Sequence, residues 1–556
     1  MRIGLFAGVA VAGLIIGLAE PSRSADEQVI DTIALSMICG NEADSSGGST
    51  PAAPVIPKRL PGFGNGGFTV TTANPEAQRW FSYGMQLAQA FAHEPAKAAF
   101  AEAARLDPTC AMCVWGQAMA EGPTINYGIS AKERADGAVF AAKAKTLATQ
   151  ATDRERRLIA AMIVRFRPVG GDAAYARAML TLSGAYADDD AIQVLAAEAL
   201  MDTGKTARVR VASGLLERVL ARSPSHTGAI HFYIHATEWI GEPGKAERYA
   251  DAMGSLAPGA SHLIHMPSHT YYRVGRYQDA ARVNLTAIAV DKAWMQTVGE
   301  TRSSWKVPYF GHNVRFALGG AMMAGDAEAA LTIAGLFDSL PVESLEHSSW
   351  MQASAASAWY AHGRFTDPDK VLAMAAPSDR TPIVRAMWRY ARGEALARKD
   401  DAKGVLAEAA AIRLTTSEKA AYRGDREVAA LLILARETLL GRAAMIEGRY
   451  GDAAAAYRKA ALKQEDVFGD GGDPPTWWYP ARRSLAAALL AGGQPDKALT
   501  EANAVLAKWP KDPMSLLVVS RAETAQGRAS EAADALKRAR SGWSGGALDR
   551  VSLNGV

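Results

Sequence analysis

The chain has 556 residues, and its 61 basic and 58 acidic side chains nearly balance at a net charge of +3. This balance excludes the strongly basic surface expected of a protein that binds nucleic acid or an anionic membrane. Hydrophobic residues make up 49% of the chain, enough for a large core. A chain of this length normally divides into several domains, unless it is built from repeats that pack only on their neighbours.

The first 24 residues have the pattern of a secretory signal peptide. Arg2 precedes an uncharged apolar stretch over 3–19, and Pro21, Ser22 and Ser24 then supply a helix breaker and small residues for cleavage. The alternative is an uncleaved anchor helix. No other apolar run is long enough to cross a bilayer. We therefore expect an exported protein, most simply a periplasmic one.

Residues 25–70 are rich in Ser, Gly and Pro, which is typical of a flexible linker. The chain has three cysteines, and in an oxidising compartment Cys110 and Cys113 can pair and leave Cys39 over. The CxxC spacing also occurs in redox enzymes, but no βαβ pattern surrounds it here. A structural disulfide or a pair of buried thiols is the preferred interpretation.

From residue 71 to about 545 the pattern is helical and matches the tetratricopeptide (TPR) repeat. The first repeat carries the signature residues Trp80, Gly84, Ala96, Phe100, Ala103 and Pro108. Gly493 and Gly527 lie one 34-residue period apart. The predicted fold is all-α, a right-handed TPR-type α-solenoid of roughly ten antiparallel helix pairs, least regular over 129–210. Residues 546–556 are predicted to be a C-terminal tail.

Two stretches interrupt the repeat period. The first is an insert over about 291–310, which carries Trp294, Trp305, Tyr309 and Phe310. The second is a Gly/Pro-rich turn followed by Trp477, Trp478 and Tyr479. Either stretch could be a lid over the groove of the solenoid. The preferred interpretation is that the bulky side chains fill irregular joints between repeats.

The histidines repeat with the TPR period. His231 and His235 are four residues apart, His265 and His269 are four apart, and the two pairs are offset by 34 residues. Residues four apart share a helix face, and in the TPR frame these places line the concave groove. His262 shares the helix face of His265 and His269, and His312 holds in the next unit the place that His262 holds in this one. Of the other histidines, His226 lies near the two pairs in the sequence. Structural roles are the preferred interpretation of His93, His347 and His362.

Imidazole is the commonest protein ligand for zinc, copper and iron, and three histidines can form an open metal site. Glu238 lies on the face of His231 and His235 as a further ligand or as a partner of a ring N–H. The zinc-protease motif HExxH is absent. Pro267 complicates the prediction, because proline breaks a helix or marks its first turn, and a helix that begins at Met266 would leave His262 and His265 in the preceding loop.

The alternative is an interaction scaffold whose groove binds a peptide or a partner helix, with the histidines as contact or pH-sensing residues. Groove contacts would then include Trp239, Tyr272, Arg273 and Arg315. A metal-dependent enzyme with Glu238 as base is a lesser alternative, and the chain is more simply a non-enzyme. Ring nitrogens that converge would favour metal, and dispersed rings would favour the scaffold.

Several phrases resemble a group of exported bacterial TPR proteins of poorly defined function that share HxxxH and HMPSH motifs. They are AFAHEPAKAAFAEAARLDPTCAMCVWGQAMAEGPTIN, HTGAIHFYIHATE, LAPGASHLIHMPSHTYYRVGRY, YFGHNVRF and PPTWWYPARRSL, between about residues 75 and 510. The resemblance implies the fold, export and a histidine site, but no reaction. The pattern of the group matches His226, His231, His235, His262, His265, His269 and His312, and departs at Arg315, where the group has a second histidine.

Overall fold

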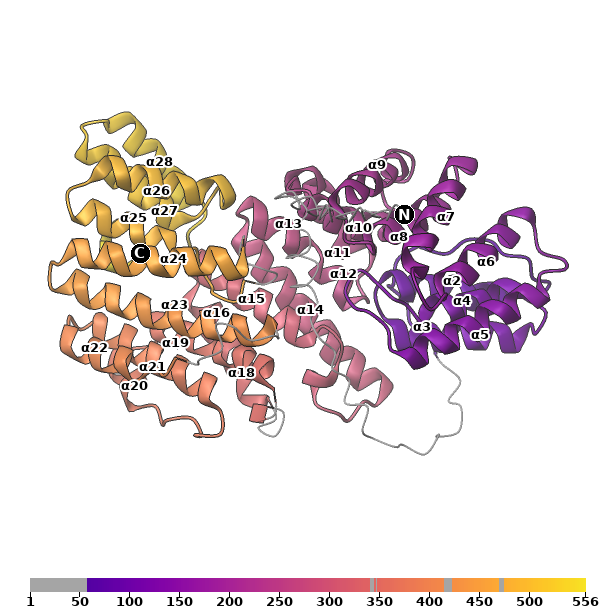
Figure 1. Cartoon of the computed structure of the whole chain (residues 1–556), viewed down its shortest axis with the longest axis horizontal. Coiled ribbons are helices and arrows are strands. Elements are labelled where there is room, and N and C mark those ends of the chain that lie inside the picture. The colour runs from indigo at the N-terminus through magenta and orange to yellow at the C-terminus, as the bar shows by residue number, and fades with distance from the viewer. Residues whose placement is uncertain (1–57, 341–344, 347, 415–422, 470–474) are drawn as a thin grey trace, which may run out of the picture.

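A computed structural model describes residues 58–340, 345–346, 348–414, 423–469 and 475–556. The predicted signal peptide, Cys39 and residues 25–57 of the predicted linker lie outside the described residues. Figure 1 shows an elongated body of helices, with its first helices at one end and its last helices at the other. Within the described residues there is no strand, and an isolated bridge joins Thr124 and Tyr127.

The N-terminal half of the body is formed by the helices from α2 to α14. Their bounds are α2 (Pro75–Gln89), α3 (His93–Leu106), α4 (Ala111–Ala120), α5 (Ala131–Leu147), α6 (Asp153–Arg165), α7 (Gly171–Ala185), α8 (Asp190–Met201), α9 (Thr206–Arg222), α10 (Thr227–Trp239), η1 (Pro243–Ala246), α11 (Glu247–Leu256), α12 (Ser261–His265), α13 (Pro267–Val274) and α14 (Tyr277–Val298).

The C-terminal half runs from η2 to η6. Its elements are η2 (Ser304–Lys306), α15 (Phe310–Ala324), α16 (Ala327–Ala334), η3 (Gly335–Ser339), α18 (Ser349–Ala356), α19 (Ala358–Phe365), α20 (Pro368–Ala373), α21 (Pro382–Ala397), α22 (Ala402–Ala411), α23 (Arg423–Ile446), α24 (Tyr450–Phe468), α25 (Arg482–Ala491), α26 (Pro495–Lys508), α27 (Pro513–Ala525), α28 (Ala529–Ser541), η5 (Leu548–Arg550) and η6 (Leu553–Gly555).

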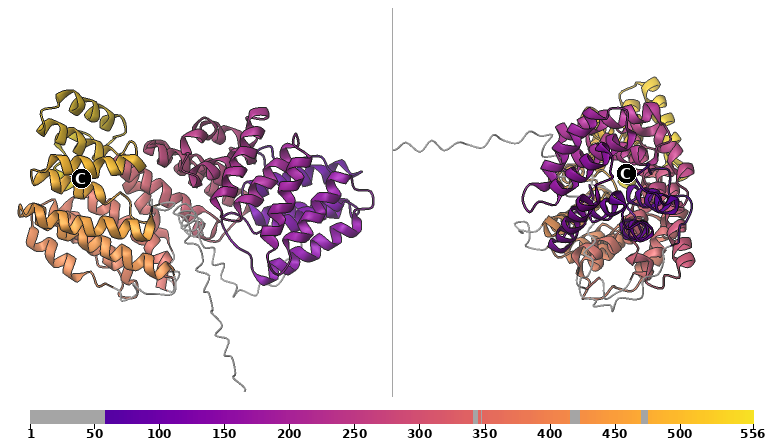
Figure 2. Two further views of the ribbon diagram at one scale, coloured as in Figure 1. Left: turned by 45° about the horizontal axis from the view of Figure 1, so that its top comes forward. Right: turned by 90° about the vertical axis from the view of Figure 1, so that its right-hand side faces the viewer.

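Consecutive helices pack side by side as hairpins, and each hairpin packs on the next. This is the architecture of a TPR-type α-solenoid, and the predicted fold class is confirmed. The stretch 129–210, where the sequence pattern is least regular, forms the same kind of hairpins from α5 to α9. The turned views in Figure 2 show the two halves meeting around the middle of the chain. No helix among the described residues has the length and apolar character needed to cross a membrane.

The first repeat shows why the signature residues form this structure. Phe100 of α3 is fully buried between Gly84 of α2 and Gly116 of α4. A Cβ atom at Gly116 would lie 2.2 Å from the Phe100 ring, and one at Gly84 would lie 2.7 Å from it. Only glycine at these places lets three successive helices close on one aromatic ring.

Gly116→Ala is therefore expected to destabilise the protein by about 1–3 kcal/mol, because the added methyl group overpacks the space around Phe100. The midpoint of urea unfolding, followed by circular dichroism, measures the loss. Gly214→Ala in α9 is the matched control, since nothing lies within 4 Å of its added Cβ. This control should gain about 0.5–1 kcal/mol from helix propensity. Equal midpoints for the two variants would contradict the packing argument.

The insert before α15 lengthens one helix instead of adding a helix pair. α14 continues for 22 residues, and a loop with η2 then returns the chain to α15. Trp305 in this loop packs on Phe310 and Phe337, so it fills a joint. Trp477 likewise packs on Tyr360 and Tyr390.

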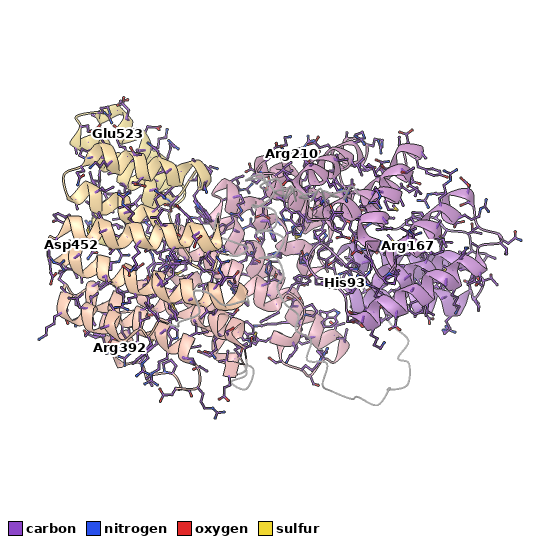
Figure 3. The ribbon with its side chains drawn as sticks, viewed as in Figure 1. His93, Arg167, Arg210, Arg392, Asp452 and Glu523 are labelled. Atoms are coloured by element: carbon purple, nitrogen blue, oxygen red, sulfur yellow. A yellow bond between two sulfur atoms is a disulfide. The ribbon has the colours of Figure 1, made fainter. Side chains whose placement is uncertain are left out.

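Both ends of the described chain pack on the solenoid. Residues 58–70, assigned to the linker by composition, run without helix along the first repeats and bury Phe63 and Val70. In this segment the Asn65 side chain accepts a hydrogen bond from the Thr227 backbone N–H (3.0 Å). At the other end η5 and η6 lead to Val556, which is buried. Figure 3 shows charged side chains on the outer surface, with Arg210 on the N-terminal half and Asp452 on the C-terminal half.

Candidate metal centre

Six histidines from four helices come together in the middle of the solenoid. α10 contributes His231 and His235, α12 contributes His262 and His265, α13 contributes His269, and α15 contributes His312. Their ring nitrogens form two groups, and within each group the candidate ligand atoms lie within 4.8 Å of one another. The first group, which we call triad A, is His231, His235 and His262, and the second, triad B, is His265, His269 and His312.

The break predicted at Pro267 does not separate these side chains. Met266, between α12 and α13, has φ −49° and ψ −40°, so the backbone stays helical through the proline. Pro267 is the first residue of α13, where a missing N–H costs no helical hydrogen bond. His262, His265 and His269 therefore remain on one continuous helical path.

The histidines do not line an open groove, and this part of the prediction is wrong. Every residue of α10 is buried, and His231, His235, His262, His265 and His269 are only 0–4% exposed. His312 alone is partly exposed. The physical reason is that the turn between α2 and α3 and the loop before α15 cover the histidine face of the repeats.

Two aromatic residues form this cover. Phe91 stacks on His262 with ring centroids 5.0 Å apart, and its ring edge meets His231 at 4.4 Å. Tyr309 also packs on His262, with ring centroids 4.3 Å apart, and lies 6.3 Å from Phe91. Both residues have positive φ values, 55° and 65°, and among the described non-glycine residues Asp400 is the third such case. Bulky residues in this conformation cost energy and tend to cluster at functional sites.

Three of the six rings have one nitrogen fixed by an acceptor. His231 Nδ1 donates to the Gln89 backbone carbonyl (2.7 Å). His265 Nδ1 donates to Asn284 Oδ1 (2.6 Å), and the Asn284 amide is oriented by donating to the Ala280 carbonyl (2.7 Å). His269 Nδ1 donates to Glu238 Oε2 (2.9 Å). In a neutral ring, a proton on Nδ1 leaves the lone pair on Nε2.

These Nε2 atoms point at other Nε2 atoms. The His265 and His269 Nε2 atoms are 2.9 Å apart, those of His265 and His312 are 3.1 Å apart, and those of His231 and His262 are 3.2 Å apart. Two ligands of a tetrahedral zinc ion with bonds of about 2.0–2.1 Å lie roughly 3.3 Å apart. The distances between these ring nitrogens are therefore close to the distance between two ligand atoms of the same metal ion.

The remaining ring nitrogens include unsatisfied ones. Both nitrogens of His235 and Nδ1 of His262 are buried without a hydrogen-bond partner. Buried polar atoms without a partner are rare and call for an explanation such as a bound ion. The donor set fits a first-row transition metal, because imidazole nitrogens dominate it.

Burial favours the neutral form of five of the six rings. It lowers the pKa of His231 to about 3 and the pKa values of His235, His262, His265 and His312 well below the usual 6.5. Neighbouring histidines add to the effect at His235 and His262. Neutral imidazole is the form that binds metal.

Glu238 is engaged on both carboxylate oxygens. Oε2 accepts from His269, and Oε1 accepts from Arg273 Nε (2.8 Å). Burial opposes ionisation of this carboxyl group, but His269 and Arg273 together lower its pKa to about 2. Such a carboxylate is a poor general base near neutral pH. It orients a ring instead, and it also forms a third group with His235 and His269.

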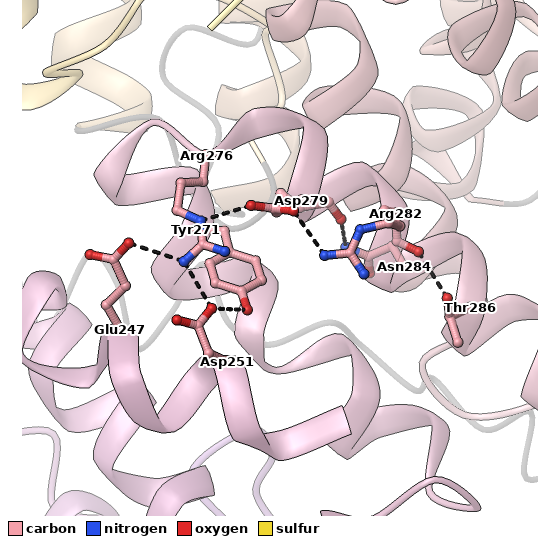
Figure 4. Close-up of polar contacts among 9 residues, drawn as sticks. Glu247, Asp251, Tyr271, Arg276, Asp279, Arg282, Asn284 and Thr286 are labelled. Carbon is pink, nitrogen blue, oxygen red and sulfur yellow. Dashed lines mark hydrogen bonds and ion pairs between the residues drawn. The ribbon is translucent and has the colours of Figure 1, made fainter. Parts of the chain in front are cut away.

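An ion-pair network outside the centre fixes α13 (Figure 4). Arg276 Nη1 donates to Glu247 (3.0 Å) and Asp251 (2.8 Å) of α11, and its Nε donates to Asp279 (2.8 Å) of α14. Tyr271 donates to the same Asp251 (2.8 Å). The helix that carries His269 is thus held to both of its neighbours.

The four residues predicted to contact a partner in the groove differ in their exposure and partners. Trp239 and Tyr272 are buried, with Trp239 near His235 and Tyr272 against Phe316 and Trp509. They are packing residues and not free contact surface, because neighbouring helices cover them. Arg273 pairs with Glu238, and Arg315 is partly exposed on α15 close to His312.

The other histidines stand outside the two triads. His226 caps α10 by accepting from the Ala229 backbone N–H (3.2 Å). His93 stacks on Phe91, and His362 lies in α19 near Thr366. His347 lies outside the described residues. Cys110 and Cys113 are joined in a disulfide at the start of α4.

Sequence reasoning missed Gln89, Phe91 and Asn284. Phe91 and Gln89 are more than 130 positions from the nearest triad residue, and no periodic signal links them to it. Asn284 carried a weak signal, as a polar residue on the buried face of α14.

Comparisons with known proteins add no function. No protein-family model matches the chain, and no curated protein does. Solved structures with a similar fold include the P58(IPK) TPR domain (13% identity, 67% of this chain and 95% of that chain, TM-score 0.20). A second is a human IFIT1 dimer with m7Gppp-AAAA (13% identity, 74% of this chain and 86% of that chain, TM-score 0.31). A third is yeast Tom70 (11% identity, 82% of this chain and 90% of that chain, TM-score 0.28). At these scores the likenesses carry no argument, and the fold assignment rests on the helix pairs themselves.

Proposed function

We propose that this protein binds a transition-metal ion, zinc, copper or iron, at the buried histidine cluster. The observation that carries the proposal is the contact between His265 and His269. Each ring has its Nδ1 proton committed to an acceptor, so two Nε2 lone pairs face each other at 2.9 Å. Two lone pairs at this distance repel unless a cation lies between them, and that cation is either a proton or a metal ion.

Two further features favour the metal over the proton. A single proton on His269 would satisfy only that one contact. It would leave His235 without a partner on either nitrogen and His262 Nδ1 unpaired. A metal ion also fits the remaining Nε2 pairs, and the Asn284, Gln89 and Glu238 acceptors are the ring-orienting partners that metal sites use.

The proposal includes export to an oxidising compartment. The signal-peptide pattern of residues 1–24 supports export. The Cys110–Cys113 disulfide agrees with it, since such bonds are rare in a reducing cytosol. Whether the metal is stored or delivered, a partner protein would dock on the outside of the solenoid and not on the buried histidines.

Metal content tests the proposal directly. The protein is purified from its native compartment without an affinity tag, and its metals are measured by mass spectrometry beside His265→Ala and His231→Ala variants. The matched control is His226→Asn, which keeps the cap of α10 and lies outside both triads. We expect bound transition metal in the wild type and the control, and less metal in both ligand variants.

Circular dichroism of each variant separates metal loss from unfolding. Absence of metal in the folded wild type, even after incubation with zinc, copper and iron, would overturn the proposal. It would leave an interaction scaffold that binds a peptide or helix in its groove. Equal metal content in all four proteins would place the ion elsewhere.

A further inference from the structure

The two triads are separate but adjacent sets of ligands. Triad A is linked by the His231–His262 contact, and triad B is linked through His265 to both His269 and His312. Each triad offers three imidazole nitrogens within 4.8 Å of one another. Three nitrogen ligands are enough to hold one ion, so one ion leaves half of the cluster unused.

The triads touch at two places. The rings of His235 and His269 have centroids 5.0 Å apart, and those of His262 and His265 are 5.6 Å apart. Two ions, one in each triad, would therefore be close neighbours. Their mutual repulsion decides which ions can occupy both triads.

The charge around the cluster is low. All six ligands are imidazoles, which bind a metal ion in their neutral form and add no negative charge. Glu238 is the one carboxylate in the three candidate ligand groups, and Arg273 already neutralises it. At equal separation, two divalent ions repel about four times as strongly as two monovalent ions. A buried site with no spare negative charge therefore accepts two monovalent ions far more easily than two divalent ions.

The surroundings also suit a soft monovalent ion. Phe91, Phe232 and Phe316 pack directly on the rings of His231, His265 and His269. An apolar wall favours an ion of low charge, and imidazole is a good ligand for copper. Cuprous copper accepts three neutral nitrogen ligands without a further anion.

We infer that the cluster is a two-ion centre that holds a pair of Cu(I) ions, one in triad A and one in triad B. The inference rests on the proposed function, because it assumes that the cluster binds metal. It adds the number of ions, their charge and the division of ligands between them.

Anaerobic titration of the metal-free full chain with Cu(I) tests the inference. Bicinchoninate competes for the copper and reports free Cu(I) by its absorbance, and bound copper is counted after desalting. We expect two equivalents in the wild type. His262→Gln should weaken the triad A ion by about 100-fold or more and leave one equivalent. His312→Gln should do the same for triad B, and the double variant should bind neither ion.

Each single variant checks its own folding by retaining the other ion, and His226→Asn should keep both. A parallel titration with Zn(II) should stop at one equivalent because of the greater repulsion. One equivalent of Cu(I) in the wild type, lost in both single variants, would overturn the two-ion inference and keep the proposed function. Two equivalents of Zn(II) would overturn the charge argument. Failure to bind either Cu(I) or Zn(II) would overturn the two-ion inference, and the proposed function would fall with it only if the protein did not bind iron either.

Discussion

Lowering the pH of the metal-free protein below 6.5 is expected to unfold it cooperatively within about two pH units. His231, His235, His262 and His265 are buried, and burial places their pKa values in the folded state well below 6.5. The unfolded chain regains ordinary histidines that bind protons near pH 6.5. Stability is therefore fully present above pH 6.5 and falls as the pH drops below it.

The expected size follows from proton linkage. Each buried histidine contributes at most about 1.4 kcal/mol per pH unit, so four contribute up to about 6 kcal/mol per unit. The total stability of a folded protein is typically about 5–15 kcal/mol. Urea midpoints at pH 7.5, 6.5 and 5.5, measured in the presence of a chelator, give the slope.

A matched variant tests the origin of this slope. His231→Gln with His262→Gln removes two of the titrating rings and should reduce the slope by up to about 2.8 kcal/mol per pH unit. Glu238 acts in a different window, because its lowered pKa of about 2 makes its contribution disappear only below about pH 4.5. A midpoint that does not change between pH 7.5 and 5.5 would contradict the burial of neutral histidines.

Asp512→Ala is expected to cost about 3–5 kcal/mol, because it leaves a buried arginine without its counter-charge. Asp512 is fully buried and accepts from Arg483 Nη1 (3.0 Å), whose side chain is 1% exposed. Asp512 also caps α27 by accepting from the Ser515 backbone N–H (3.0 Å). Arg483 has no other carboxylate partner among the described residues, and its Nε and Nη2 are already unpaired.

The measurement is again the urea midpoint. The double variant Arg483→Met with Asp512→Ala should be more stable than Asp512→Ala alone, since it removes the unpaired charge. Asp549→Ala is the surface control. Its partner Arg540 and Asp549 itself are both more than half exposed, so the midpoint should not move. If the double variant were as unstable as Asp512→Ala alone, the lost stability would come from the missing cap of α27 and not from the unpaired arginine.

The sequence by itself determined the fold and the place of the histidine cluster. Gly84, Phe100 and the 34-residue period encode contacts between neighbours along the chain, and a repeat fold is built almost wholly from such contacts. The offset between His231 and His265 follows from the same period. It brings the two pairs onto adjacent helices without any knowledge of the tertiary structure.

The burial of the cluster was decided by the tertiary structure. Phe91 and Tyr309 reach the histidines from loops, Gln89 reaches them from the end of α2, and Asn284 fixes His265 from α14. Helical periodicity reports which residues share a face, but not which segment later covers that face. The division into two triads depends on ring orientations set by these long-range hydrogen bonds. For that reason the sequence predicted a histidine patch in an open groove, whereas the folded chain forms a closed centre.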